Sequence, residues 1–222
     1  SFPEGTTDEP LLLLWPVGGS ANVLSVNLDM LAEVGFDAPA TTLEDFKAIA
    51  CAAAELEGPN GEDVQGFPIR QDGFDLESWI AAFGGTIYDG EQYTFTDPAT
   101  IQVLTFFQEL YNEGCAYIAE GFDNTAHFAF GTNPMAQGST AGVPFINGDI
   151  EASGVPKTWV NTIVPYDPEV GPTIQVFLRS LVIYTAPPEE ELASWLFMKY
   201  ITETENHILW TEMTRYFPFT AS

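Results

Sequence analysis

The sequence predicts an α/β protein. Segments rich in β-branched and aromatic residues alternate with segments that place apolar residues every three or four positions, as expected when strands and helices alternate. Hydrophobic residues form 45% of the chain and include 17 Phe, 8 Tyr and 5 Trp, so there is enough apolar surface to exclude intrinsic disorder. A length of 222 residues allows one large domain or two small ones.

The N-terminal segment is expected to hold two strands and a short helix. Residues 11–16 and 22–26 are predicted strands, and Val17-Gly18-Gly19-Ser20 is predicted to be a flexible connector between them. The helix covers residues 27–34 and ends at Gly35, a residue type suited to the left-handed position after a helix.

A second helix is predicted from a capping signal. Thr41 and Glu44 have the spacing of a capping box, in which the hydroxyl and the carboxylate each satisfy a free amide. The helix ends at Gly58-Pro59-Asn60-Gly61, and its apolar stripe consists of Phe46, Ile49, Ala50, Ala53 and Ala54.

The middle of the chain contains a strong helix start. In Asp97-Pro98, Asp suits the N-cap and Pro suits the first helical position. The apolar face of this helix is expected to consist of Ile101, Leu104, Phe107 or Gln108, and Tyr111. The other expected elements here are a strand at 64–69, a helix at 76–83, a hairpin of 86–88 with 93–95, a helical turn at 124–130 and a loop at 131–142.

The C-terminal part predicts two strands followed by two helices. The strands cover 158–164 and 173–184, with a Pro- and Gly-rich connection between them. The first helix begins at Pro187-Pro188, and the three glutamates that follow complement its dipole. The second helix covers 204–214.

The charge of the chain excludes several classes of partner. There are 32 acidic and 6 basic residues, giving a formal charge of -26, and the basic residues are scattered singly. Nucleic-acid binding needs clustered Lys and Arg, so no nucleic-acid partner is expected, and an anionic membrane surface would repel the protein. No stretch approaches the roughly 20 apolar residues that span a bilayer.

The two cysteines leave two readings open. Cys51 and Cys115 each lie in or just after a helical segment, and the pair is either two buried thiols or one disulfide. A disulfide closing this loop would stabilise the fold by about 4 kcal/mol in the chain-entropy model. Metal binding is poorly supported, because only His127 and His207 could join the cysteines and no ligand spacing is present.

Catalytic motifs are poorly supported as well. In Gly138-Ser139-Thr140-Ala141-Gly142 the serine is the second residue, whereas a nucleophile elbow needs it third. With 32 carboxylates, any chosen glycosidase-like pair carries little weight. No phosphate loop or dinucleotide fingerprint is present, so neither a cofactor nor an enzymatic activity is expected.

Aromatic residues near glycine-rich segments give the better functional signal. Trp15, Phe74, Phe145 and Tyr216 each lie close to such a segment or to the isolated Arg215. Sugars are bound by aromatic faces that cover their C–H surfaces, while carboxylates, amides and Arg take their hydroxyls. Each of these aromatic residues, taken singly, is better explained as part of a core than as a ligand-binding surface.

Several ordered motifs resemble one known family. The segments Asn27 to Leu31 with Gly35-Phe36, and then Pro39 to Phe46, are similar to the "YNKDLLEEAG…PPTTWDEF" stretch of family 1 extracellular solute-binding proteins. These are the maltose-binding-like receptors of ABC sugar importers. The likeness continues through Gly66-Phe67, Trp79 to Gly85, Phe95 to Pro98, Gly138-Ser139, Pro165, Pro188 to Phe197, and Tyr216-Phe217-Pro218.

This resemblance implies a periplasmic-binding-protein-like fold of two α/β lobes, with ligand held in a cleft between them. Residues 1–22 would be part of lobe 1 with the first crossover, 23–165 would be lobe 2, and 166–222 would be the second crossover with another part of lobe 1. The chain would therefore contain most of lobe 2 and only part of lobe 1.

The resemblance also implies a set of ligand-binding positions. Asp72 falls where relatives place a hydroxyl-binding carboxylate, and Phe74 falls where they place a stacking Tyr. Ser20 replaces a crossover Glu, and the segment 138–145 occupies the place of a stacking Trp. The full set of expected ligand-binding residues is Trp15, Ser20, Asp72, Phe74, Ser139, Phe145, Arg179 and Tyr216.

The implied function is an extracytoplasmic substrate-binding component of an ABC importer that binds a sugar or oligosaccharide. Its partners would be a carbohydrate and the permease subunits. It would be a monomer. Its location would be the periplasm, or the outer face of the cell membrane if it is anchored there as a lipoprotein. In that compartment a Cys51–Cys115 disulfide becomes the favoured reading. Two alternatives remain: an extracellular glycoside hydrolase that uses Asp72, and a surface or structural protein that reuses the scaffold.

Overall fold

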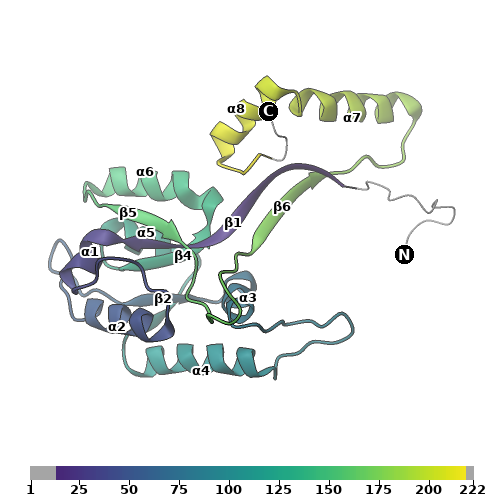
Figure 1. Ribbon diagram of the computed structural model, residues 1–222. Coiled ribbons are helices and arrows are strands. Elements are labelled where there is room, and N and C mark those ends of the chain that lie inside the picture. The colour runs from purple at the N-terminus through teal and green to yellow at the C-terminus, as the bar shows by residue number, and fades with distance from the viewer. Residues whose placement is uncertain (1–13, 219–222) are drawn as a thin grey trace. The chain divides into compact units, whose positions relative to one another are not determined.

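The computed structural model describes residues 14–218 and divides into two compact units. Unit 1 combines the two ends of the chain, up to Ser20 and from Val176 onward, whereas unit 2 is the continuous segment Ala21–Gln175. The lobe boundaries implied by the resemblance, after residues 22 and 165, stay a prediction. The α/β class itself is confirmed, because strands and helices alternate along the chain (Figure 1).

Unit 2 contains two sheets. In one, the long strand β1 (Trp15–Asn27) pairs antiparallel with β4 (Met135–Ser139) on one side and with β5 (Trp159–Thr162) on the other. In the other, β2 (Phe67–Arg70) pairs parallel with β3 (Ala116–Ala119), and Arg70 lies opposite Ala119. The parallel pair matters for function, because both of its strands end at the same edge of the sheet.

The helices of unit 2 begin at well-defined caps. The Asn27 side chain accepts from the amides of Asp29 and Met30 at the start of α1, and Asp97 accepts from the amide of Ala99 at the start of α4, as predicted. Asp72 caps α3. The helices are α1 (Leu28–Glu33), α2 (Leu43–Ala53), α3 (Gly73–Ala82), α4 (Pro98–Asn112), α5 (Asp123–Phe130) and α6 (Val143–Ser153), the last preceded by the 3₁₀ turn η1 (Thr140–Gly142).

An aromatic cluster forms the centre of the unit 2 core. Phe46 from α2 lies 5.0 Å, centroid to centroid, from both Phe67 and Trp79, and both contacts are edge-on. Phe106 and Phe107 from α4 complete the cluster. Edge-on aromatic pairs add about 0.5–1.5 kcal/mol each to the stability that burial provides. The cluster therefore joins α2, α3 and α4 to β2.

A disulfide joins α2 to the start of β3. Cys51 and Cys115 are bonded, with their Cα atoms 4.3 Å apart, so the disulfide reading is confirmed. Glu113 lies close to both sulfur atoms. Because both sulfurs are spent in the disulfide, this group has no thiolate to offer a metal ion.

Several sequence predictions were wrong in detail. Residues 17–20 are part of β1 and not a flexible connector, because Gly19 pairs with Phe217 and the segment is buried. The N-cap of α2 is Thr42, whose side chain accepts from the Asp45 amide, so the cap lies one residue after Thr41. Of the expected loop 131–142, residues 135–139 form β4 and residues 140–142 form η1, and helix α6 that follows was not predicted.

The buried face of α4 also differs from the prediction. Ile101, Leu104 and Tyr111 are exposed, and the helix buries the neighbouring stripe instead. Both stripes have helical spacing, so the pattern alone could not choose between them. The contact of α4 with the aromatic cluster decides it, and the buried residues are Ala99, Thr100, Val103, Phe106 and Leu110.

Unit 1 is smaller. Its strand β6 (Val176–Leu181) pairs with β1, and helices α7 (Pro188–Ile201) and α8 (Thr204–Thr214) follow, as predicted. Gly18 lies against Tyr216 so closely that an added Cβ atom would be 2.9 Å from that ring. Of the predicted strand at 11–16, residues 11–13 lie outside the described residues, while Trp15 and Pro16 begin β1. Among residues 14–218, no helix is long and apolar enough to cross a membrane.

Candidate functional site

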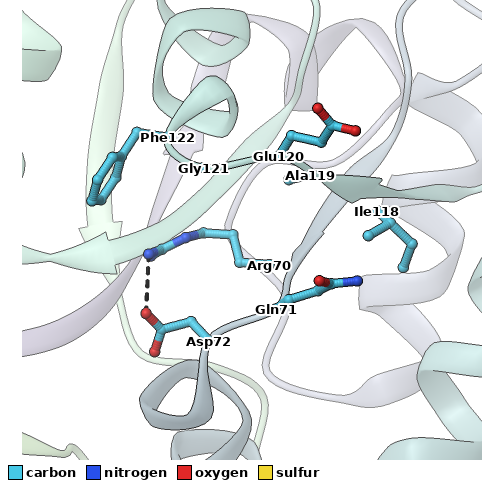
Figure 2. Close-up of a pocket in the computed structure, with 8 residues that line it drawn as sticks. All are labelled: Arg70, Gln71, Asp72, Ile118, Ala119, Glu120, Gly121 and Phe122. Atoms are coloured by element: carbon cyan, nitrogen blue, oxygen red, sulfur yellow. Dashed lines mark hydrogen bonds and ion pairs between the residues drawn. The ribbon is translucent and has the colours of Figure 1, made fainter.

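A polar cavity lies where the parallel strands of unit 2 end. Its volume is about 610 Å³, and its lining comes from residues 70–72, at the end of β2, and 118–122, at the end of β3 (Figure 2). In sheets with parallel strands, ligands bind outside the carboxyl ends of the strands, where loops carry side chains to a common edge. The fold therefore places a candidate site at this edge.

Arg70 is the central side chain of this cavity. Its Nη2 atom lies 3.2 Å from Oδ2 of Asp72, and its Nη1 atom lies 3.0 Å from Oδ2 of Asp75. Nη1 also donates to the Gln137 carbonyl oxygen at 3.3 Å. The Phe122 ring covers the guanidinium, with 5.5 Å between the Arg70 Cζ atom and the ring centroid. Because two carboxylates and a carbonyl oxygen hold its guanidinium, Arg70 has a fixed orientation at the cavity wall.

A buried hydrogen-bond network supports Arg70 from below. The Gln137 side chain accepts from the Trp79 indole at 2.8 Å and donates to Asn22 Oδ1 at 3.1 Å. Asn22 in turn donates to Asp75 Oδ1 at 2.7 Å. Burial raises the pKa of the Asp75 carboxyl, while the hydrogen bond from Asn22 and the charge of Arg70 act to lower it. The network joins β1, α3 and β4 beneath the site.

A second cavity, of about 580 Å³, shares two walls with the first. Arg70 and Phe122 line both cavities. The Phe122 and Phe145 rings are 77% and 75% exposed, so both are presented to solvent at this site. The remaining lining is mostly small or apolar and includes Ala126, Ala136, Gly138, Ser139, Ala141, Gly142 and Ile146.

Four of the predicted ligand-binding residues belong to unit 2. Asp72 lines the polar cavity, while Ser139 and Phe145 line the second one. Phe74 is exposed in the first turn of α3, two residues from Asp72. The structure thus places Asp72, Ser139 and Phe145 around cavities that Arg70 and Phe122 connect.

The other four predicted residues belong to unit 1. Trp15 packs edge-on against Trp195, with ring centroids 6.1 Å apart. Tyr216 lies near Trp210 and against Gly18. Ser20 is buried in β1, and Arg179 is exposed on β6. A ligand-binding role for these four stays a prediction.

Sequence reasoning missed Arg70 and Phe122. In the sequence Arg70 is one of six scattered cations, yet it directly follows the predicted strand 64–69 and stands two residues before the carboxylate of Asp72. Phe122 follows Gly121 and stands two residues before the predicted helical turn 124–130. The register of β2 with β3, which brings these two loops together, is a long-range feature that no local motif reveals.

The chain belongs to the bacterial extracellular solute-binding protein family, whose model matches residues 5–222. The members of this family are defined by binding a solute rather than by catalysis. No curated protein matches the sequence significantly.

Solved structures show the same fold. UgpB from Mycobacterium tuberculosis, in complex with glycerophosphocholine, is 18% identical with a TM-score of 0.74, covering 90% of this chain and 52% of that one. An ABC transporter solute-binding protein from Agrobacterium radiobacter K84, in complex with ribitol, is 22% identical with a TM-score of 0.73, covering 93% and 53%. Maltose-bound T. maritima MalE3 is 17% identical with a TM-score of 0.74, covering 93% and 54%. The chain therefore spans about half the length of these two-lobed binding proteins.

Proposed function

We propose that this chain provides carbohydrate-binding residues of an extracytoplasmic receptor that delivers its ligand to an ABC importer. One observation carries the proposal: an oriented Arg70–Asp72 pair lies at the carboxyl edge of a parallel strand pair, beside two exposed phenylalanine rings. Membership of the solute-binding family supports it, as do the ribitol and maltose bound to two proteins of the same fold.

The chemistry of the site suits a polyhydroxylated ligand. Exposed rings such as Phe122 and Phe145 cover the C–H faces of a sugar, and fixed polar groups take its hydroxyls. The hydroxyl oxygen of Ser139 accepts from the Ala141 amide, and its own proton is available to a ligand. Gln71 and Glu120 contribute further polar groups at the first cavity.

Asp72 favours a binding role over a hydrolytic one. Its Oδ1 accepts from the amide of Phe74 at 2.9 Å, and its Oδ2 pairs with Arg70 at 3.2 Å. Because both interactions hold the carboxylate in place, Asp72 is oriented to accept hydrogen bonds from the hydroxyl groups of a ligand. As a receptor the protein catalyses no reaction. The permease subunits recognise the loaded form, and the ligand favours that form only through its differential affinity.

The proposed cellular location is outside the cytoplasmic membrane, in the periplasm or anchored at its outer face. A disulfide within unit 2 is consistent with such an oxidising compartment. We propose that the receptor acts as a monomer.

Saturation-transfer NMR with a panel of monosaccharides, alditols and oligosaccharides tests this function, because the method detects weak ligands. At least one carbohydrate should give a signal with the wild-type chain. The signal should be lost in Arg70→Ala and weakened in Phe122→Ala. It should remain in Phe130→Ala, which removes an exposed ring at the other end of α5. A panel without any signal would refute carbohydrate binding.

A further inference from the structure

The second cavity differs from the first in having an apolar floor. Small residues make room for it, among them Ala126, Ala136 and Gly138, while Phe122, Phe145 and Ile146 supply its bulky apolar surface. An exposed cavity of about 580 Å³ with a mostly apolar lining is a place where an apolar group of a ligand can be buried favourably. We propose that this cavity is a subsite for an apolar group carried by the ligand, so that the natural ligand is a glycoside or another amphipathic carbohydrate.

Most of the polar side chains in the wall of this cavity are already paired within the protein, while the Asn124 Oδ1 atom is buried without a partner. The Ser25 hydroxyl donates to Asn161 Oδ1 at 2.8 Å, and the Thr125 hydroxyl donates to the Phe122 carbonyl oxygen at 2.9 Å. The Asn124 amide donates to the Gln137 carbonyl oxygen at 3.0 Å. A sugar hydroxyl placed among them would give up its bonds to water and gain few in return, which is unfavourable.

The start of α6 adds no free donor at its first position. The 3₁₀ turn η1 continues directly into the helix, and the Val143 amide donates to the Thr140 carbonyl oxygen. Two polar side chains remain for a ligand, the Ser139 hydroxyl and the exposed carboxylate of Asp149. The floor between them therefore favours an aryl or alkyl group over a second sugar ring.

The two cavities are adjacent, since Arg70 and Phe122 line both, so one ligand can extend from one cavity to the other. Its polyhydroxylated part would lie beside Arg70, Gln71 and Asp72, and its apolar part would lie between Phe122 and Phe145. This assignment rests on the proposed carbohydrate-binding function and specifies the ligand class within it.

The test compares methyl and 4-nitrophenyl glycosides of glucose, galactose and maltose by calorimetry and saturation-transfer NMR. For any sugar that binds, the aryl glycoside should bind about tenfold tighter than the methyl glycoside, because the ring buries apolar surface. In Phe145→Ala this advantage should shrink.

A variant whose new side chain fills the cavity is a more specific test than the removal of the Phe145 ring. A Cβ atom added to Gly142 meets no atom within 4 Å, and Gly142 lines the cavity, so Gly142→Leu can extend into it without a clash. Gly148 is equally open but does not line the cavity, and it lies within α6, the helix that Gly142 precedes. Gly142→Leu should abolish the aryl advantage while methyl glycosides still bind, and Gly148→Leu should preserve both. Thermal melting checks that each variant is folded.

The possible results distinguish a failure of the apolar subsite from a failure of the proposed carbohydrate-binding function. If methyl and aryl glycosides bind equally to the wild type, the apolar subsite is refuted and carbohydrate binding stands. If the aryl advantage survives Gly142→Leu, the aryl group binds elsewhere and the subsite is equally refuted. If neither these glycosides nor the wider sugar panel binds, the proposed function itself fails.

Discussion

Removing the Cys51–Cys115 disulfide is expected to cost unit 2 a large part of its stability. The bridge spans 64 residues of sequence. In the chain-entropy model the entropy removed from the unfolded chain is about 2.1 + 1.5R ln 64, or roughly 14 cal/mol/K, which corresponds to about 4 kcal/mol at 25 °C. Typical domains have only about 5–15 kcal/mol in total.

The loop that the disulfide closes contains most of the aromatic core. Phe67, Trp79 and Phe106 all lie between the two cysteines, and α2 joins the cluster through Phe46. Breaking the bridge removes no large side chain from this cluster. The loss should therefore come mainly from the greater freedom of the unfolded chain.

The assay is urea unfolding of the oxidised chain, the reduced chain and the Cys51→Ala/Cys115→Ala variant, followed by tryptophan fluorescence. The reduced chain and the variant should each lose about 4 kcal/mol. Their m-values should rise, because an unfolded chain without the cross-link exposes more surface. A loss below about 1 kcal/mol with an unchanged m-value would refute this reasoning.

Three further predictions concern unit 2. Gly66 has φ of +70°, and an added Cβ atom would lie 2.1 Å from the Cys115 carbonyl oxygen. In urea unfolding, Gly66→Ala should therefore lose far more stability than Gly61→Ala, because Gly61 has a similar φ of +84° but open surroundings. Equal losses would contradict the close approach of Gly66 to Cys115. Trp79→Phe leaves Gln137 Oε1 buried without its indole donor. The free energy of unfolding should fall by about 1–3 kcal/mol for the lost hydrogen-bond partner alone. A variant with nearly unchanged stability would show that this hydrogen bond contributes little. Because the pKa of Asp75 is raised above its ordinary value of 3.8, the folded chain binds more protons than the unfolded chain at pH values between the two. The contribution of this group to stability therefore falls as pH rises from 3.8 through the raised pKa. Relative to the wild type, Asp75→Asn should gain stability over that interval, and a stability difference that does not change with pH would contradict the assignment.

Local signals in the sequence were sufficient for much of the secondary structure. Helices start at Asn27, Asp97 and Pro188 as predicted, because side-chain caps and a proline in the first turn are local signals that depend on a few adjacent residues. The cap at Thr42 was missed by one position because two threonines stand side by side and either one suits the role. A strand through Gly18 and Gly19 could not be foreseen, since the pairing of Gly19 with Phe217 joins distant segments.

Features that depend on tertiary contact were not predictable from local pattern. Two apolar stripes compete on α4, and only the position of Phe46 and Trp79 selects the one that contains Phe106. Arg70 likewise becomes a site residue only because β2 and β3 are parallel and in register. Family resemblance pointed to Asp72, Ser139 and Phe145, but the cavities that connect them emerged from the fold.

The central claim is that carbohydrate binds to unit 2 at the carboxyl edge of β2 and β3. The most direct measurement is a ¹H–¹⁵N NMR titration of the chain with the tightest sugar from the panel, including the Arg70 side-chain Nε–H signal. Binding at this edge should concentrate the chemical-shift changes within unit 2 in residues 70–73, 118–123 and 138–146. Saturable shifts that leave these segments and Arg70 unchanged would contradict it.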